Sequence, residues 1–286
     1  TSYLAGGGVK MSALRAALDR RDPFPWREPV RSMMPTGEPL PAGGDGQVAR
    51  RALLIVGSPK TKSPSTSGVL GEELLGRLAA AGWQTESLTL KPSTFREAGE
   101  AELLAAVDRA DLILLAFPLY IDALAYLVTR ALEVIAEHRR AAGEGARLQG
   151  LFALANNGFP EAHQNNLALS ILRHFAARSG MAWLGGMALG AGEGMIGGHP
   201  LEAKSTDGIP LFRVSQALDA AGAAIARGEA VPAEAVQGMA SVPIPHMPRF
   251  IWHRLFMRGA ASFWQKQAAS QGLSKADMLA APHGAP

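Results

Sequence analysis

The chain has 286 residues, of which 48% are hydrophobic and 19% charged, so it has enough apolar material for a globular core and is not a disordered chain. Its formal net charge of +3 is mild and no block of like charges occurs, which argues against nucleic acid as a partner. The absence of cysteine excludes disulfides and thiolate chemistry, so any redox activity requires a cofactor.

The first 48 residues are dense in Pro and Gly, which interrupt regular elements. We therefore predict an N-terminal extension over residues 1–48. Within it, residues 11–20 are predicted to form one short helix, and Trp26 is predicted to pack on the main domain.

Two observations bear on where the protein resides. The sequence lacks a basic region followed by an apolar core of the signal-peptide type. Its longest apolar run, residues 112–128, is interrupted by Pro118 and Asp122, which favours a strand followed by a helix over a membrane span. We therefore expect a cytoplasmic protein without a transmembrane helix.

Residues 49–230 alternate between short apolar runs and helical periodicity, the pattern of βαβ units. The predicted strands are residues 52–56, 84–90, 111–117, 151–155 and 183–189, the second being the most alternating and so nearest an edge. The predicted helices are centred on residues 70–78, 103–107, 124–135, 167–175 and 211–225. This alternation predicts a doubly wound, five-stranded parallel sheet with helices on both faces, which binds a ligand beyond the carboxyl ends of its strands.

The loop after the first predicted strand, residues 57–68, reads GSPKTKSPSTSG and leads directly into a helix. Six hydroxyl side chains and two lysines thus surround a helix N-terminus, whose free N–H groups and dipole favour a phosphate. Neither a Walker loop nor the glycine pattern of a classical dinucleotide fold is present. The alternative is an ordinary polar loop in which Ser67 caps the helix.

Three further loops are predicted at the same edge of the sheet. The segment 117–122, FPLYID, places an aromatic after a proline and can form a wall for a planar ring, or it is a turn in which Pro118 ends the strand and Tyr120 caps the core. The segment 156–161, NNGFPE, contains a glycine that lets the backbone approach a ligand closely. The glycine-rich loop 190–198 is interpreted as flexible.

Taken together, these segments resemble the flavodoxin-like NAD(P)H-dependent FMN reductase family over residues 51–225. The resemblance rests on GSPK at 57–60 with STS at 65–67, on FPLY at 117–120 and on NNGFPEAH at 156–163. It implies a flavodoxin-like fold and a phosphate site formed by Ser58, Lys60, Ser65, Thr66 and Ser67. It also implies that the flavin ring is framed by Pro118, Leu119, Tyr120, Ile121, Asn156, Asn157, Gly158 and Phe159.

The function implied by the resemblance is an FMN-dependent oxidoreductase that passes electrons from NAD(P)H to a small acceptor such as free flavin or a quinone. The alternatives are a flavodoxin-type electron carrier and a non-catalytic flavin-binding protein. Because FMN carries the reaction, no side chain is predicted to be catalytic. No His, Asp or Glu set has metal-ligand spacing, so no metal site is predicted, and we expect a homodimer.

Residues 231–286 are predicted to be a C-terminal tail with an amphipathic helix, because aromatic and basic residues alternate between 249 and 266. The favoured interpretation is that this helix packs on its own domain or on a partner subunit. Peripheral contact with an anionic membrane is the second interpretation, and nucleic-acid binding is the least favoured.

Overall fold

The computed structural model describes residues 40, 49–60, 64–143, 146–206, 211–241, 244, 247–274 and 276–277. The chain divides into two compact units, one spanning Pro25–Pro243 and one combining Thr1–Phe24 with Ile244–Pro286. The helix predicted over residues 11–20, and Trp26, lie outside the described residues.

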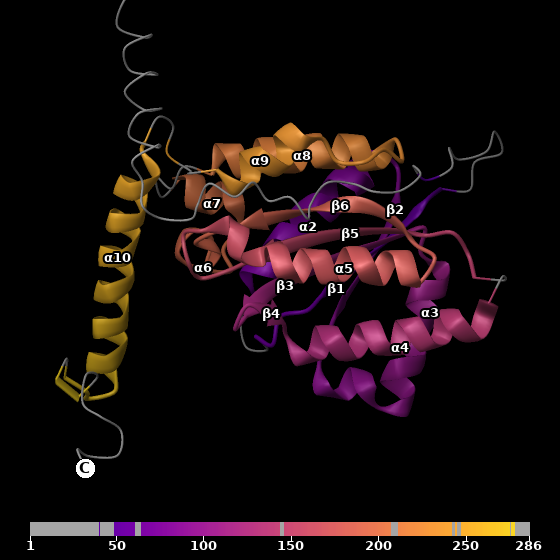
Figure 1. Ribbon diagram of the computed structural model, residues 1–286, viewed down its shortest axis with the longest axis horizontal. Coiled ribbons are helices and arrows are strands. Elements are labelled where there is room, and N and C mark those ends of the chain that lie inside the picture. The colour runs from indigo at the N-terminus through magenta and orange to yellow at the C-terminus, as the bar shows by residue number, and fades with distance from the viewer. Residues whose placement is uncertain are drawn as a thin grey trace, which may run out of the picture. The chain divides into compact units, whose positions relative to one another are not determined.

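The larger unit is built on a sheet of five parallel strands in the order β2-β1-β3-β5-β6 (Figure 1). Their bounds are Arg51–Val56 for β1, Gln84–Thr89 for β2, Leu112–Tyr120 for β3, Gly150–Asn156 for β5 and Ala182–Leu189 for β6. This is the strand order of the flavodoxin-like doubly wound fold, so the predicted fold class is confirmed. The edge position predicted for the second strand is also confirmed.

Burial explains why these segments form strands. β1 is buried from Ala52 to Val56, and β5 and β6 are buried along their whole length, as expected for parallel strands covered by helices on both faces. Each fully buried Leu or Ile contributes about 1.5 to 3 kcal/mol relative to an exposed one. β2 is mostly exposed because it has a neighbour on one side only.

Helices cover both faces of the sheet (Figure 1). One layer contains α2 (Thr66–Ala80), α8 (Phe212–Ala226) and α9 (Ala233–Ala240), and the other contains α3 (Glu97–Arg109), α4 (Tyr126–Ala142) and α5 (Asn166–Arg178). Short helical segments are η2 (Pro92–Phe95), η4 (Ala162–Asn165), α6 (Gly192–Met195) and α7 (Leu201–Thr206). All five predicted helices are present, and α6, α7 and α9 are additions that the periodicity did not indicate.

The third strand differs from its prediction. β3 does not end at Phe117 but continues to Tyr120, turns at Ile121 and Asp122, and pairs antiparallel with β4 (Ala123–Leu124). Pro118 does not end the strand. Its backbone lacks an N–H group, but no hydrogen bond to β1 is lost, because β1 pairs with β3 only as far as Ala116. Consequently α4 begins at Tyr126, two residues later than the predicted helix start.

The predicted C-terminal helix is α10 (Arg249–Ser270), and it belongs to the smaller unit. No helix in the described part of the chain is long and apolar enough to cross a membrane.

Candidate functional site

The carboxyl ends of β1, β3 and β5, which are neighbours in the sheet, bring three of the predicted loops to one rim. The strand order reverses between β1 and β3, since β2 and β3 lie on opposite sides of β1. Open parallel sheets bind ligands at such a reversal. The structure therefore gathers the predicted site segments at the edge where a ligand is expected. We call this edge the carboxyl rim.

The hydroxyl side chains of the first loop gather at the start of α2. Ser65 is the N-cap, and its Oγ accepts a hydrogen bond from Gly68 N at 3.0 Å. The alternative cap at Ser67 is therefore wrong, and the Ser67 Oγ instead accepts from Asn156 Nδ2 at 2.7 Å. Ser58 and Thr66 are both 3% exposed. The N-terminal end of the helix dipole thus faces a set of buried hydroxyls.

A carboxylate also lies at this helix terminus. Glu193 Oε1 is 2.7 Å from the Lys60 Nζ, and Thr66 Oγ1 donates to Glu193 Oε2 at 3.3 Å. Glu193 is not among the site residues that the sequence predicts, because it lies in the glycine-rich loop 190–198. An anionic side chain therefore already lies where the end of α2 favours negative charge.

The glycines of the loop after β6 allow close packing. A Cβ on Gly190 would lie 2.4 Å from the Pro160 carbonyl oxygen, and one on Gly198 would lie 2.1 Å from that of Pro64. The loop thus touches both the β5 loop and the β1 loop, and Gly192 N donates to Asn157 O at 2.9 Å. The interpretation of this loop as merely flexible is wrong, because the glycines fix it against its neighbours.

Asn157, the first residue after β5, has a hydrogen-bond acceptor without a described partner. Its side-chain Nδ2 donates to Glu161 O at 2.9 Å, which fixes the orientation of the amide. Its Oδ1 is buried and has no hydrogen-bond partner among the described residues. A buried polar atom without a partner costs about 1 to 3 kcal/mol. Next to it, a Cβ on Gly158 would meet no atom within 4 Å, so the backbone there is open to approach.

The remaining predicted ring residues form an exposed apolar surface. Pro118 and Leu119 are half-buried, whereas Tyr120 is 48% and Ile121 98% exposed. Phe159, on the β5 loop, is 56% exposed. Two aromatic side chains therefore stand open to solvent on loops that follow adjacent strands.

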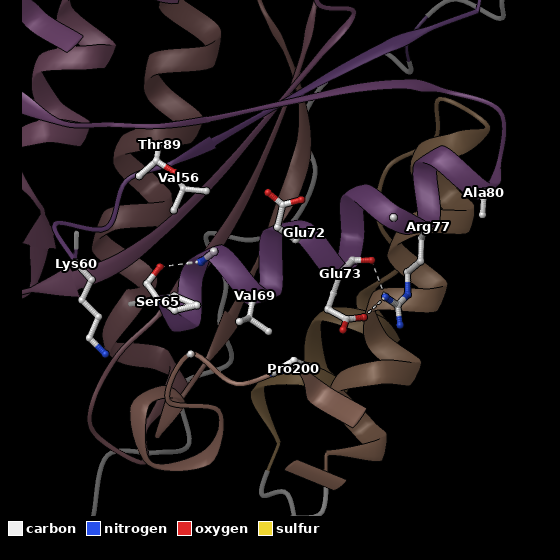
Figure 2. Close-up of a pocket in the computed structure, with 14 residues that line it drawn as sticks. Val56, Lys60, Ser65, Val69, Glu72, Glu73, Arg77, Ala80, Thr89 and Pro200 are labelled. Carbon is white, nitrogen blue, oxygen red and sulfur yellow. Dashed lines mark hydrogen bonds and ion pairs between the residues drawn. The ribbon is translucent and has the colours of Figure 1, made fainter. Parts of the chain in front are cut away.

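A groove of about 720 Å³ begins at the same end of α2 (Figure 2). It runs from Lys60 and Ser65 along the helix to Arg77 and Ala80. Figure 2 shows the Glu73 carboxylate paired with Arg77 one turn further on, at 2.9 Å. The groove shares two residues with the predicted phosphate site and none with the loops after β3 and β5. It therefore adjoins the carboxyl rim without being the predicted ring site.

In the part of the chain that the structure describes, no three His, Asp or Glu side chains are grouped so that they could hold a metal ion.

No family model and no curated protein sequence matches the chain. Solved structures of other proteins do match it. The Trp repressor binding protein from Bacillus subtilis matches with 13% identity and a TM-score of 0.44, covering 59% of this chain and 96% of that one. The NAD(P)H:quinone oxidoreductase from Methanothermobacter marburgensis has 15% identity, a TM-score of 0.43, and coverage of 60% and 98%.

An NADH:FMN oxidoreductase in its apo form has 17% identity, a TM-score of 0.43, and coverage of 71% of this chain and 99% of that one. The fold assignment itself rests on the strand order of this chain.

Proposed function

We propose that the chain is an FMN-dependent oxidoreductase that passes electrons from NAD(P)H to a small acceptor such as free flavin or a quinone. One observation carries the proposal. Buried hydroxyls at the start of α2 and the unpaired Asn157 Oδ1 occur on the loops that follow β1 and β5, the two strands that flank β3 in the sheet. The first feature suits a phosphate and the second suits a ligand with a buried N–H donor.

The phosphate is assigned to the end of α2. There the hydroxyls of Ser58, Thr66 and Ser67 can rotate to donate to phosphate oxygens, and the N–H groups of the first helical turn point outward. The Lys60 ammonium adds a positive charge on an exposed side chain. Because Glu193 now engages Lys60 and Thr66, a phosphate would displace this carboxylate.

The flavin ring is assigned to the loops after β3 and β5. Asn157 Oδ1 would accept from a ring N–H group, which removes the penalty of an unpaired buried acceptor. Gly158 leaves room for the ring edge, and the exposed Tyr120 and Phe159 supply apolar surface for its faces.

Bound FMN would supply the hydride and electron chemistry. The protein's own residues would hold the cofactor, set the polarity around it and leave one side accessible. No side chain is assigned an acid, base or nucleophile role, in keeping with a reaction in which the cofactor accepts and releases the electrons.

The test is an absorbance spectrum of the purified chain mixed with FMN and separated from free cofactor. We expect stoichiometric FMN, anaerobic bleaching on addition of NADH or NADPH, and recovery of colour when a quinone is added. Bleaching by dithionite but by neither nicotinamide would indicate an electron carrier instead. Failure to take up FMN at micromolar concentration would contradict the proposal altogether.

A further inference from the structure

Helix α10 differs from the α-helices of the α/β unit because none of its large apolar side chains is buried. Its 22 residues contain eight large apolar side chains and four Arg or Lys, and no Asp or Glu. The large apolar residues are Phe250, Ile251, Trp252, Leu255, Phe256, Met257, Phe263 and Trp264. None of them is buried, and Phe263 and Trp264 are 51% and 61% exposed. A surface of this kind marks an interaction site.

Most of the aromatic side chains and three of the four Arg or Lys residues fall on opposite halves of the helix. At about 100° per residue, Phe250, Met257 and Trp264 follow one another at intervals of seven residues and share a face. By the same spacing Trp252, Phe256 and Phe263 lie on the adjoining face of the same half.

The basic residues Arg254, Arg258 and Lys266 fall on the other half. Ile251 and Leu255 are the two large apolar side chains among them. Arg249, the first residue of the helix, and His253 fall by the same spacing on the aromatic half. The helix therefore has a mainly aromatic half and a half that carries three of its basic residues.

Three kinds of partner could cover this surface, and the charge pattern selects one. A helix that docks in a protein groove uses a narrow stripe of anchors, whereas here the aromatic residues extend over about half the circumference. A second copy of α10 would bring like charges together, because the helix has no acidic residue. An anionic lipid surface accepts a wide apolar face rich in Trp and Phe and attracts basic side chains.

We propose that α10 lies along the surface of an anionic membrane, with Phe250, Trp252, Phe256, Phe263 and Trp264 in the interface and the basic residues near the lipid headgroups. The helix lies on the bilayer and does not cross it, since Arg254 and Arg258 stand in its middle and it is not apolar enough to span. This inference concerns a separate unit of the chain and is independent of flavin binding.

Flotation of the full chain with vesicles tests the proposal. We expect binding to phosphatidylcholine vesicles that contain phosphatidylglycerol, weakening as salt is raised, and little binding to phosphatidylcholine alone. Replacing Arg254, Arg258 and Lys266 together by Gln should weaken binding about tenfold or more, because each basic residue near the surface contributes to the attraction. Phe263→Ala with Trp264→Ala should weaken it without unfolding the protein, since both side chains are exposed.

A matched control changes the net charge equally in the other unit. Arg96, Arg140 and Arg178 are exposed side chains of the α/β unit, and their joint replacement by Gln should leave vesicle binding unchanged. Equal loss in this control, or no flotation of the unaltered chain, would overturn the proposal. So would a dimer in sedimentation that the Phe263 and Trp264 replacements dissociate, because α10 would then pair with a second copy.

Discussion

The two ends of the same sheet differ in how their polar groups are paired, although Trp183 Nε1, near the amino end of β6, is buried without a partner among the described residues. At the amino ends of the strands, Arg139 is 7% exposed and donates to the carbonyl oxygens of Ser179 at 2.7 Å and Gly180 at 3.2 Å, and to the Gln149 side chain. Gln149 in turn donates to Val107 O at 2.6 Å and Ala110 O at 2.8 Å. Two side chains that are hydrogen-bonded to each other therefore supply donors to carbonyls at the end of α3 and in the residues that follow α5.

At the carboxyl rim, a buried side-chain acceptor has no described hydrogen-bond partner and three residues other than glycine have a left-handed backbone. Asn157 Oδ1 is buried without a partner among the described residues, and Ile121, Asp122 and Ala191 have left-handed backbones with φ of 47°, 57° and 58°. Tyr120 is half exposed. A buried acceptor without a described partner and left-handed residues other than glycine make this rim the candidate for a ligand site.

The largest effect is expected from Arg139→Leu at the amino end. The substitution leaves the buried Gln149 oxygen without its donor and removes the donor to the carbonyls of the more exposed Ser179 and Gly180, so it should lower the free energy of unfolding by about 3 kcal/mol. Urea denaturation measures this loss. Arg140→Leu, at the exposed neighbouring position, should change stability by less than about 0.5 kcal/mol. Equal losses in the two variants would show that the network is not what stabilises this end.

Thr66→Val at the carboxyl rim should affect binding more than folding. It keeps the shape of a buried side chain but removes a hydroxyl assigned to the phosphate. A hydrogen bond to a charged group is worth about 1.5 to 3 kcal/mol, so we expect FMN affinity to fall about thirtyfold. Quenching of flavin fluorescence measures it, and riboflavin, which lacks the phosphate, should bind the variant and the parent equally. A matching loss for riboflavin would place the phosphate elsewhere.

Asn157→Ala should weaken FMN and riboflavin alike, because Asn157 is assigned to the ring. Loss of one neutral hydrogen bond of about 1 kcal/mol corresponds to about a fivefold fall in affinity. Asn165→Ala is the control, since its Oδ1 also lacks a described partner but the residue is 0% exposed and out of reach of a ligand. A selective effect on FMN, or an equal effect of the control, would contradict the assignment.

The features that sequence predicts are those that depend on neighbours in the chain. Continuous apolar runs at 52–56 and 151–155 predict buried parallel strands, and their order places the polar loops at one edge. Glu193 could not be predicted, because its contact with Lys60 joins residues 133 apart and depends on how glycines pack the β6 loop. The continuation of β3 beyond Pro118 could not be predicted either, because it depends on where β1 stops pairing with β3.

Glu193→Gln tests whether the carboxylate competes with a phosphate for the end of α2. The amide keeps the size of the side chain but removes the negative charge that pairs with Lys60. Both partners are substantially exposed and screened by solvent, so we expect FMN to bind only about threefold more tightly, with riboflavin unchanged. Glu137→Gln, on α4 in the other helix layer, provides the same charge change at an exposed residue. Weaker FMN binding in the Glu193 variant would mean that the carboxylate supports the site.

The smallest expected effect concerns the turn between β3 and β4. Here we expect a gain in stability, whereas Arg139→Leu is expected to lower stability. A two-residue turn with both φ values positive favours Asn-Gly, yet the chain has Ile121 and Asp122 there. Ile121 is 98% exposed, so packing does not explain a β-branched residue in this conformation. Replacing the pair by Asn-Gly should raise stability by about 0.5 kcal/mol, because relief of strain exceeds the added flexibility of the unfolded chain.

Thermal denaturation of the Asn-Gly variant should therefore show a slightly higher midpoint. If Ile121 is retained for contact with the ring or the acceptor, the same variant should turn over NAD(P)H more slowly with a quinone while it folds better. Gain of stability with unchanged turnover would leave the turn without a role in the site. Loss of stability would show that the left-handed pair is not strained, and the contrast between the two ends of the sheet would then rest on Asn157 and the exposed aromatic side chains.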